Sequence, residues 1–125
     1  IMPGVSPDDI KTELEHIVAN KEVVVTRADD RNASLSSPLR EDILSAYSNS
    51  IHVRFPTAPI MPEMSTGATD ARPFRIAGVP IYGVNGAWGV SPDDMRAHGR
   101  DERLPVQALS DNVDHWSRMI TVLAG

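Results

Sequence analysis

The feature that most constrains the fold is the alternation of amphipathic segments with short apolar runs. Apolar side chains recur about every four residues over 7–19 and 106–124, whereas residues 22–26 and 79–84 form short runs rich in β-branched or apolar side chains. The first spacing is typical of helices and the second composition is typical of strands. Together they favour an α/β layer architecture.

The first helix has a clear start. The Ser6 side chain can cap free amides, Pro7 fits the first turn, and Asp8 and Asp9 suit the positive end of the helix dipole. We therefore predict a helix over residues 7–19.

Sequences on either side of this helix suggest a larger unit. Ile1-Met2-Pro3-Gly4 reads like the end of a strand that enters a turn, so we expect the chain to begin inside a longer protein. With the strand predicted at 22–26, residues 1–27 make a strand-end, helix, strand unit with α+β packing. Residues 28–37 are polar and turn-rich, which is typical of a linker or a domain crossing.

The rest of the chain, residues 38–125, carries the α/β prediction. We predict a helix opened by Pro38, with apolar side chains every fourth residue, and closed at Phe55-Pro56. Further elements are a short helix over Thr69–Ala77 that stops at Gly78, a buried strand over 79–84, a glycine-containing loop over 85–97, and a last helix over 106–124. Apolar residues of that last helix fall on one face, namely Leu109, Val113, Trp116, Ile120 and Leu123.

Composition excludes several classes of protein. The 125 residues fit one ordinary domain, and 41% hydrophobic with 23% charged residues is typical of a soluble globular protein. No apolar run approaches the roughly 20 residues of a membrane helix. A net charge of −5 without a basic cluster disfavours nucleic acid as a partner. The absence of cysteine excludes disulfides and thiolate zinc sites, and leaves the cellular compartment open.

Two polar loops could carry chemistry, 64–72 and 97–103. In the first, Thr69, Asp70 and Arg72 place a hydroxyl, a carboxylate and a guanidinium within one turn. Local chemistry alone favours a simpler explanation, a capped helix with an Asp–Arg surface pair.

His98 lies between Ala97 and Gly99 in the second loop, away from any apolar stripe. A lone histidine is weak evidence of a zinc site, because zinc takes three or four protein ligands and no partner stands at a recognisable spacing. The remaining histidines are better explained as solvated or packing residues (His16, His52 and His115). A Gly-x-Ser-x-Gly elbow, a phosphate-binding glycine loop and a His-Glu-x-x-His pair are all missing, so serine nucleophile catalysis has no support.

At these loops the sequence resembles a known family. The matching stretches are Ser65-Thr66-Gly67-Ala68-Thr69-Asp70-Ala71-Arg72, Phe74-Arg75-Ile76-Ala77-Gly78-Val79-Pro80, and Ala97-His98-Gly99-Arg100-Asp101-Glu102-Arg103. The family is that of the co-catalytic zinc exopeptidases and amidohydrolases, which includes aminoacylases, carboxypeptidase G, di- and tripeptidases and succinyl-diaminopimelate desuccinylase. The match extends over residues 60–124 and is weaker over the first unit.

The resemblance implies a fold. Residues 1–30 would be the last helix-strand unit of a ferredoxin-like lid or dimerisation domain. Residues 31–125 would be the C-terminal half of a zinc-peptidase catalytic α/β domain.

The resemblance also implies a function, the hydrolysis of amide bonds in small peptides or N-acyl amino acids. His98 would be the last zinc ligand, and Gly67, Thr69, Asp70 and Arg72 would belong to the substrate pocket. Two zinc ions in the complete enzyme would polarise the substrate carbonyl and lower the pKa of a bridging water, whose proton a glutamate would take.

This chain departs from the family pattern in one respect. The family's other zinc ligands and the catalytic glutamate belong to the first half of its chain and have no counterpart here, so we expect these 125 residues alone to be inactive. The alternative is a stand-alone, non-catalytic domain that uses the same loops for binding or self-association. Because strand edges and an apolar face would lack their neighbours, we expect the isolated chain to be a homo-oligomer or to adopt a rearranged fold.

Overall fold

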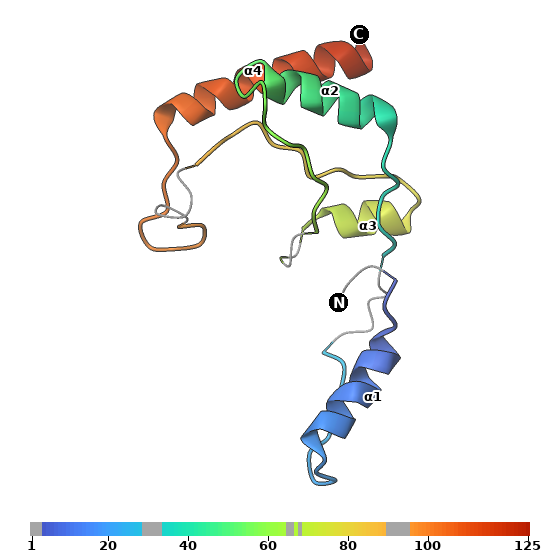
Figure 1. Cartoon of the computed structure of the whole chain (residues 1–125). Coiled ribbons are helices and arrows are strands. Elements are labelled where there is room, and N and C mark those ends of the chain that lie inside the picture. The colour runs from blue at the N-terminus through green and yellow to red at the C-terminus, as the bar shows by residue number, and fades with distance from the viewer. Residues whose placement is uncertain (1–3, 29–33, 65–66, 68, 90–95) are drawn as a thin grey trace. The chain divides into compact units, whose positions relative to one another are not determined.

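The computed structural model describes residues 4–28, 34–64, 67, 69–89 and 96–125. The described residues form four helices, which are α1 (Pro7–Val18), α2 (Glu41–His52), α3 (Ala71–Ile76) and α4 (Val106–Ala124) (Figure 1). The chain divides into two compact units. The first combines residues 1–38 with 66–82 and contains α1 and α3, and the second combines residues 39–65 with 83–125 and contains α2 and α4.

The predicted α/β architecture is wrong, because the described residues contain no β-strand and no sheet. Residues 22–26 and 79–84 run without ladder partners, and Val79 is 48% exposed where a buried strand was expected. A β-branched run only suits a pleated surface, whereas a strand also needs a neighbour to bind its N–H and C=O groups. Pro80 lacks an N–H for such a ladder. The helix-strand unit of a ferredoxin-like lid and the α/β catalytic layer are therefore replaced by two helical units.

Side-chain hydrogen bonds hold the extended segment of the first unit in place of a β-ladder. The Ser37 hydroxyl donates to the carbonyl of Ile81 (2.8 Å) and accepts from its amide (2.9 Å). Tyr82 donates its phenol to the carbonyl of Pro38 at 2.7 Å. One hydroxyl thus satisfies both backbone groups of Ile81, which a neighbouring strand would otherwise do.

Helix α1 begins as predicted. Ser6 Oγ accepts hydrogen bonds from the amides of Asp8 (3.2 Å) and Asp9 (3.4 Å), which satisfies two of the free donors of the first turn. The helix ends at Val18, and Ala19 closes it in the left-handed conformation with φ 47°. No residue of α1 is buried, so its apolar stripe is exposed.

Some predictions fall on residues outside the described ranges. They are the strand end at residues 1–3, half of the linker at 29–33, three positions of the first motif at 65, 66 and 68, and part of the glycine-containing loop at 90–95. Gly4, which follows the first of these, has φ +83° in a turn.

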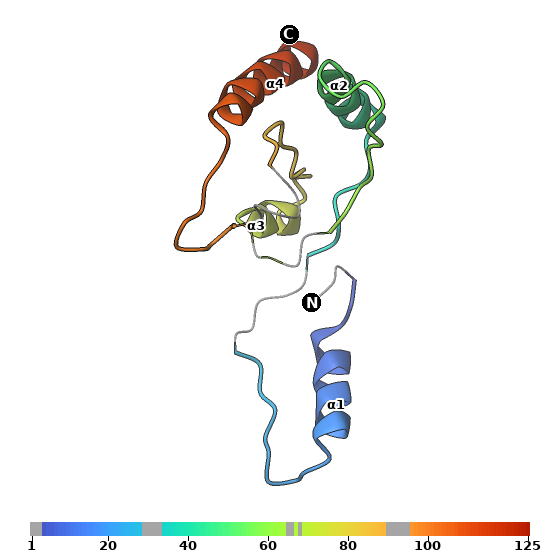
Figure 2. The same ribbon diagram turned by 60° about the vertical axis from the view of Figure 1, so that its left-hand side comes forward.

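The second unit is built on the packing of α2 against α4. The two helices lie side by side and run in opposite directions (Figures 1 and 2). Their buried apolar residues are Ala46, Ala108 and Met119, and buried polar side chains join them, namely Ser50, Asp111 and His115. Small residues at this interface let the helix backbones approach closely.

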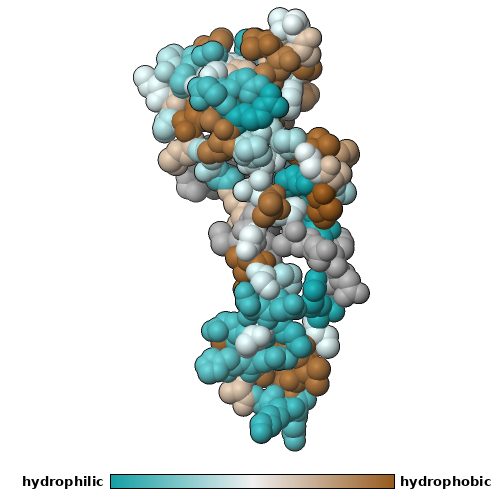
Figure 3. Space-filling model, turned by 90° about the vertical axis from the view of Figure 1, so that its right-hand side faces the viewer, coloured by the Kyte–Doolittle hydropathy of each residue, from teal (hydrophilic) through white to brown (hydrophobic). Residues whose placement is uncertain are grey.

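Helix α4 has the predicted bounds but turns an unexpected face outward. Its buried positions are Ala108, Asp111, His115 and Met119, whereas the predicted apolar stripe is exposed. Figure 3 shows brown apolar residues at the surface among polar ones. None of the helices in the described part of the chain has the length and apolar character needed to cross a membrane.

Candidate functional site

The first motif lies at the start of α3. Thr69 Oγ1 accepts a hydrogen bond from the amide of Ala71 at 3.0 Å, so this hydroxyl caps the helix. Asp70 is the residue before the first helical position, and its side chain makes no capping bond. Arg72 is half-buried on the first turn, while Gly67 and Thr69 are exposed. Polar groups therefore gather at the helix start, as the sequence predicted.

The end of α3 confirms the predicted stop. Gly78 has φ +83°, and the amides of Gly78 and Val79 bind the carbonyls of Arg75 (3.0 Å) and Phe74 (2.9 Å). This pair of bonds closes a helix through a left-handed residue, a conformation that glycine adopts without strain.

His98 lies in a tight turn with an unusual backbone conformation. Its φ is +65°, which is uncommon for a residue with a Cβ, and its side chain is exposed. The amide of Gly99 donates to the carbonyl of Arg96 at 2.8 Å, and an ion pair joins Arg96 to Asp101. The turn thus presents the imidazole outward on a locally ordered backbone.

The predicted site residues are divided between the two units. Gly67, Thr69, Asp70 and Arg72 belong to the first and His98 to the second, so each motif is described within its own unit. Within the described ranges, no three or more histidine, aspartate or glutamate side chains gather in a way that could hold a metal ion. The imidazole of His98 could supply one nitrogen to a zinc ion, which takes three or four protein ligands.

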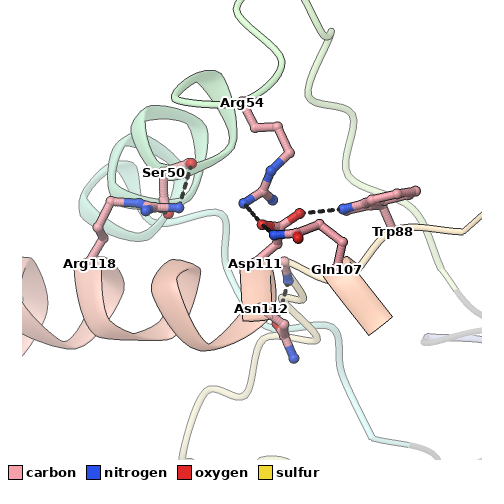
Figure 4. A network of polar contacts seen from close by, with 8 residues as sticks. Ser50, Arg54, Trp88, Gln107, Asp111, Asn112 and Arg118 are labelled. Carbon is pink, nitrogen blue, oxygen red and sulfur yellow. Dashed lines mark hydrogen bonds and ion pairs between the residues drawn. The ribbon is translucent and has the colours of Figure 1, made fainter. Parts of the chain in front are cut away.

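A buried polar network in the second unit was not predicted (Figure 4). Its centre is the carboxylate of Asp111 on α4, which is 6% exposed. This carboxylate accepts from Trp88 Nε1 (2.8 Å) and Gln107 Nε2 (2.9 Å), and pairs with Arg54 at 2.7 Å. Three donors from three parts of the unit therefore converge on one buried carboxylate.

These contacts favour the ionised form of Asp111. The hydrogen bond from Trp88 lowers the pKa of the carboxyl most, followed by the one from Gln107, and the positive charge of Arg54 lowers it further. Burial of the carboxylate raises its pKa, but this effect is smaller than the combined effect of the contacts, so the pKa of Asp111 is lowered. Only the Gln107–Asp111 pair, at i, i+4 spacing on a helix, gave a sequence signal that could have revealed this network.

The segment before Trp88 is held to both helices. Asn112 Oδ1 accepts from the amide of Gly86 at 3.0 Å, and the Tyr47 hydroxyl donates to the carbonyl of Asn85 at 3.1 Å. Asn85 Oδ1 also accepts from the amide of Ala87 at 2.9 Å. The backbone of residues 85–87 is therefore fixed on the α2–α4 pair.

His115 is the most enclosed titratable group of the described residues. It is 1% exposed, and neither ring nitrogen has a hydrogen-bond partner in the described part of the chain. Burial lowers the pKa of its imidazole, and the positive charges of Arg118 and Arg54 lower it further. Tyr47 and Trp116 contact the ring edge to face, with centroids 5.4 and 5.8 Å away. The ring is thus held neutral as a packing element.

A shallow groove of about 460 Å³ runs between α2 and α4. Ala46, Val53 and Val122 supply much of its apolar lining. At its wall Arg118 donates through Nε to Ser50 Oγ (2.9 Å) and through Nη2 to the Ser50 carbonyl (3.3 Å). The guanidinium therefore joins the two helices.

Comparison of the chain with protein-family models, with curated proteins and with solved structures gives no match.

Proposed function

We propose that the chain is the C-terminal portion of a zinc-dependent metallopeptidase of the carboxypeptidase or aminoacylase type. The proposal depends on the two motifs around Arg72 and His98. The observation that carries it is the turn at His98. This exposed residue has the left-handed backbone conformation, and the turn around it is closed by the Gly99–Arg96 hydrogen bond and the Arg96–Asp101 ion pair. Backbone strain of this kind is concentrated at functional sites, where the surrounding structure maintains it.

His98 would be one ligand of a zinc ion in the complete enzyme. Its exposure supports this role, because the ring nitrogens remain accessible to an ion held jointly with other parts of the enzyme. When bound, zinc would polarise the amide carbonyl and make a water molecule more acidic. The contribution of His98 is to hold its imidazole at a fixed place on an ordered turn.

The start of α3 would bind substrate in the complete enzyme. Gly67 has no side chain and allows close approach of a peptide backbone. Thr69 and Asp70 add a hydroxyl and a carboxylate, while Arg72 can form a forked pair with the free carboxylate of a small peptide or N-acyl amino acid. The capping bond of Thr69 to Ala71 keeps this turn ordered.

Exposed apolar faces support the view that other parts of the enzyme cover this portion. Ile17 of α1 is 68% exposed, and Val113 and Ile120 of α4 are 61% and 59% exposed. Contiguous exposed apolar surface in a folded protein marks a site of contact with another surface.

The test is His98→Ala in the complete enzyme, compared with His16→Ala on the exposed surface of α1. We expect the His98→Ala enzyme to fold normally, to lose one bound zinc and to lose hydrolysis. The His16→Ala enzyme should keep its bound zinc and its hydrolytic activity. A His98→Ala enzyme with two bound zinc ions and full activity would refute the proposal. The purified 125-residue chain should hydrolyse no dipeptide or N-acyl amino acid.

A further inference from the structure

We infer that His115 makes the attachment of residues 85–88 to the α2–α4 pair sensitive to acid. In the closed state that the structure shows, the neutral ring packs against this segment. A proton on the ring favours an open state, in which the segment has left the two helices. This device lies within the second unit and is independent of the proposed zinc site.

The ring of His115 has no partner for an added proton in the closed state. It is 1% exposed, and neither ring nitrogen has a hydrogen-bond partner in the described part of the chain. A neutral imidazole has one N–H donor, whereas the protonated ring has two donors and a full positive charge. Because an unpaired charge is far more costly to bury than an unpaired polar group, protonation requires that part of the cover leave the ring.

The ionisable groups around the ring add to this effect. Burial lowers the pKa of the imidazole most, and the positive charges of Arg118 on α4 and Arg54 beyond the end of α2 lower it further. Asp111 lies one turn before His115 on α4, but its carboxylate already binds three donors. Tyr47 of α2 contacts the ring edge to face and donates its hydroxyl to a backbone carbonyl of the segment. These groups therefore offer the protonated ring no hydrogen bond in the closed state.

Residues 85–88 are the most weakly held cover of the ring. A Cβ built on Gly86 would stand 2.7 Å from ring atom Cδ2 of His115, which adjoins Nε2. The segment carries no ionisable side chain, and Gly86 is its only buried residue. Hydrogen bonds to side chains of α2 and α4 hold it through the Asn85 carbonyl, the Gly86 amide and the Trp88 indole, at 3.1, 3.0 and 2.8 Å. Its departure therefore uncovers one edge of the ring and removes no buried side chain from the core.

The α2–α4 pair keeps its own contacts when the segment leaves. Arg118 donates to Ser50 Oγ at 2.9 Å and Arg54 pairs with Asp111 at 2.7 Å, so polar contacts still join the two helices. Met119, which is 2% exposed, remains in their apolar interface. A local opening that exposes little apolar surface needs less free energy than unfolding of the whole unit. The segment is therefore the part that acid releases first.

Hydrogen exchange of the wild-type 125-residue chain measures this opening. The Gly86 amide and the Trp88 indole N–H are followed at about pH 7.5 and about pH 5.5, each against the exchange rate of an unstructured chain at the same pH. We expect the protection of both groups to fall about tenfold at the lower pH, because a ring uncovered one pH unit below its ordinary pKa of about 6.5 binds a proton with about tenfold preference.

Two helix amides, those of Ser50 and Met119, serve as the reference for this exchange. They should stay better protected than the segment at both pH values, because they exchange only when the helix pair separates. Protection of the segment that does not change with pH overturns the inference. Protection equal to that of the two helix amides also overturns it, because the whole unit would then open at once.

Variants assign the pH dependence to His115. His115→Met fills the space without titrating, so the protection of Gly86 should become the same at both pH values. His16→Gln is the matched control and should keep the wild-type change, because His16 is exposed on α1. A wild-type pH dependence in a folded His115→Met chain overturns the inference.

A measurement on the wild type decides the matter where His115→Met fails to fold. The ring signal of His115, followed by NMR, should titrate over the same pH range in which Gly86 loses protection. Titration of His115 that leaves the protection of Gly86 unchanged overturns the inference.

Discussion

Gly86 lies directly against the ring of His115. A Cβ built on Gly86 would stand 2.3 Å from both Cβ and Cγ of His115, a separation that real side chains do not tolerate. His115 is 1% exposed, so its ring is enclosed on all sides. Glycine at position 86 is therefore required for the segment before Trp88 to reach α4.

This contact predicts the effect of Gly86→Ala. The added methyl would push His115 or the backbone aside, and overpacking of this kind costs about 1–3 kcal/mol in the free energy of unfolding. Urea denaturation of the wild type and the variant measures the difference. Gly89→Ala is the matched control, because a Cβ there would meet nothing within 4 Å. Equal destabilisation by the two substitutions would argue against the close packing at Gly86.

The neutral state of His115 predicts a loss of stability in acid. The pKa of this imidazole is lowered in the folded chain, so between that value and the ordinary pKa of about 6.5 the unfolded chain binds more protons. The free energy of unfolding should therefore be constant above roughly pH 7 and fall as the pH drops through about 6.

Thermal or urea unfolding between pH 5 and pH 8 tests this dependence. His115→Met should remove most of the slope, because methionine fills the space without titrating. His16→Gln should leave it in place, because His16 is exposed on α1. A slope that survives in the His115→Met variant would assign the acid sensitivity to other groups.

The exposed stripe of α4 predicts self-association of the isolated chain. Leu109, Val113 and Ile120 are 58%, 61% and 59% exposed on one helix face. Light scattering should report an oligomer, and Val113→Glu should shift it towards the monomer by placing a charge in the contact. Ser110→Glu carries the same charge at a neighbouring position off the stripe and should change the mass less. A monodisperse wild-type monomer would contradict the prediction.

The helices could be predicted because their signals are local. Ser6 caps α1, and Gly78 ends α3 within a few residues of the turns that they define. The predicted strands at 22–26 and 79–84 failed because a strand depends on distant partners that a propensity does not specify. Helical periodicity identified the apolar stripe of α4 but not its exposure, since the packed face uses small and polar residues instead.

The candidate site likewise has some features that the local sequence predicts and others that it does not. The polar start of α3 and the loop position of His98 followed from short sequence stretches. The Asp111–Trp88 bond joins residues 23 positions apart, and the sequence around either residue contains no pattern that predicts it. Roles in zinc or substrate binding came from the family resemblance and remain predictions.

Arg72 is half-buried on the first turn of α3. If its guanidinium holds the substrate carboxylate, the pair is forked and charge-assisted, and lysine cannot reproduce its geometry. Arg72→Lys and Arg72→Met should then each cost about 2–5 kcal/mol of transition-state binding in the complete enzyme. A role in a surface ion pair alone predicts at most about 1 kcal/mol and no dependence on substrate charge.

Assays on a substrate with a free carboxylate and on its neutral amide separate these two roles of Arg72. Arg75→Met is the matched control, because Arg75 lies on the same helix and donates to Ser34 Oγ at 3.2 Å. We expect the wild type and the control to prefer the carboxylate strongly, and both Arg72 variants to lose this preference. An unchanged preference in the Arg72 variants would make Arg72 a structural residue of α3, because a guanidinium that binds the carboxylate cannot be removed without reducing the discrimination.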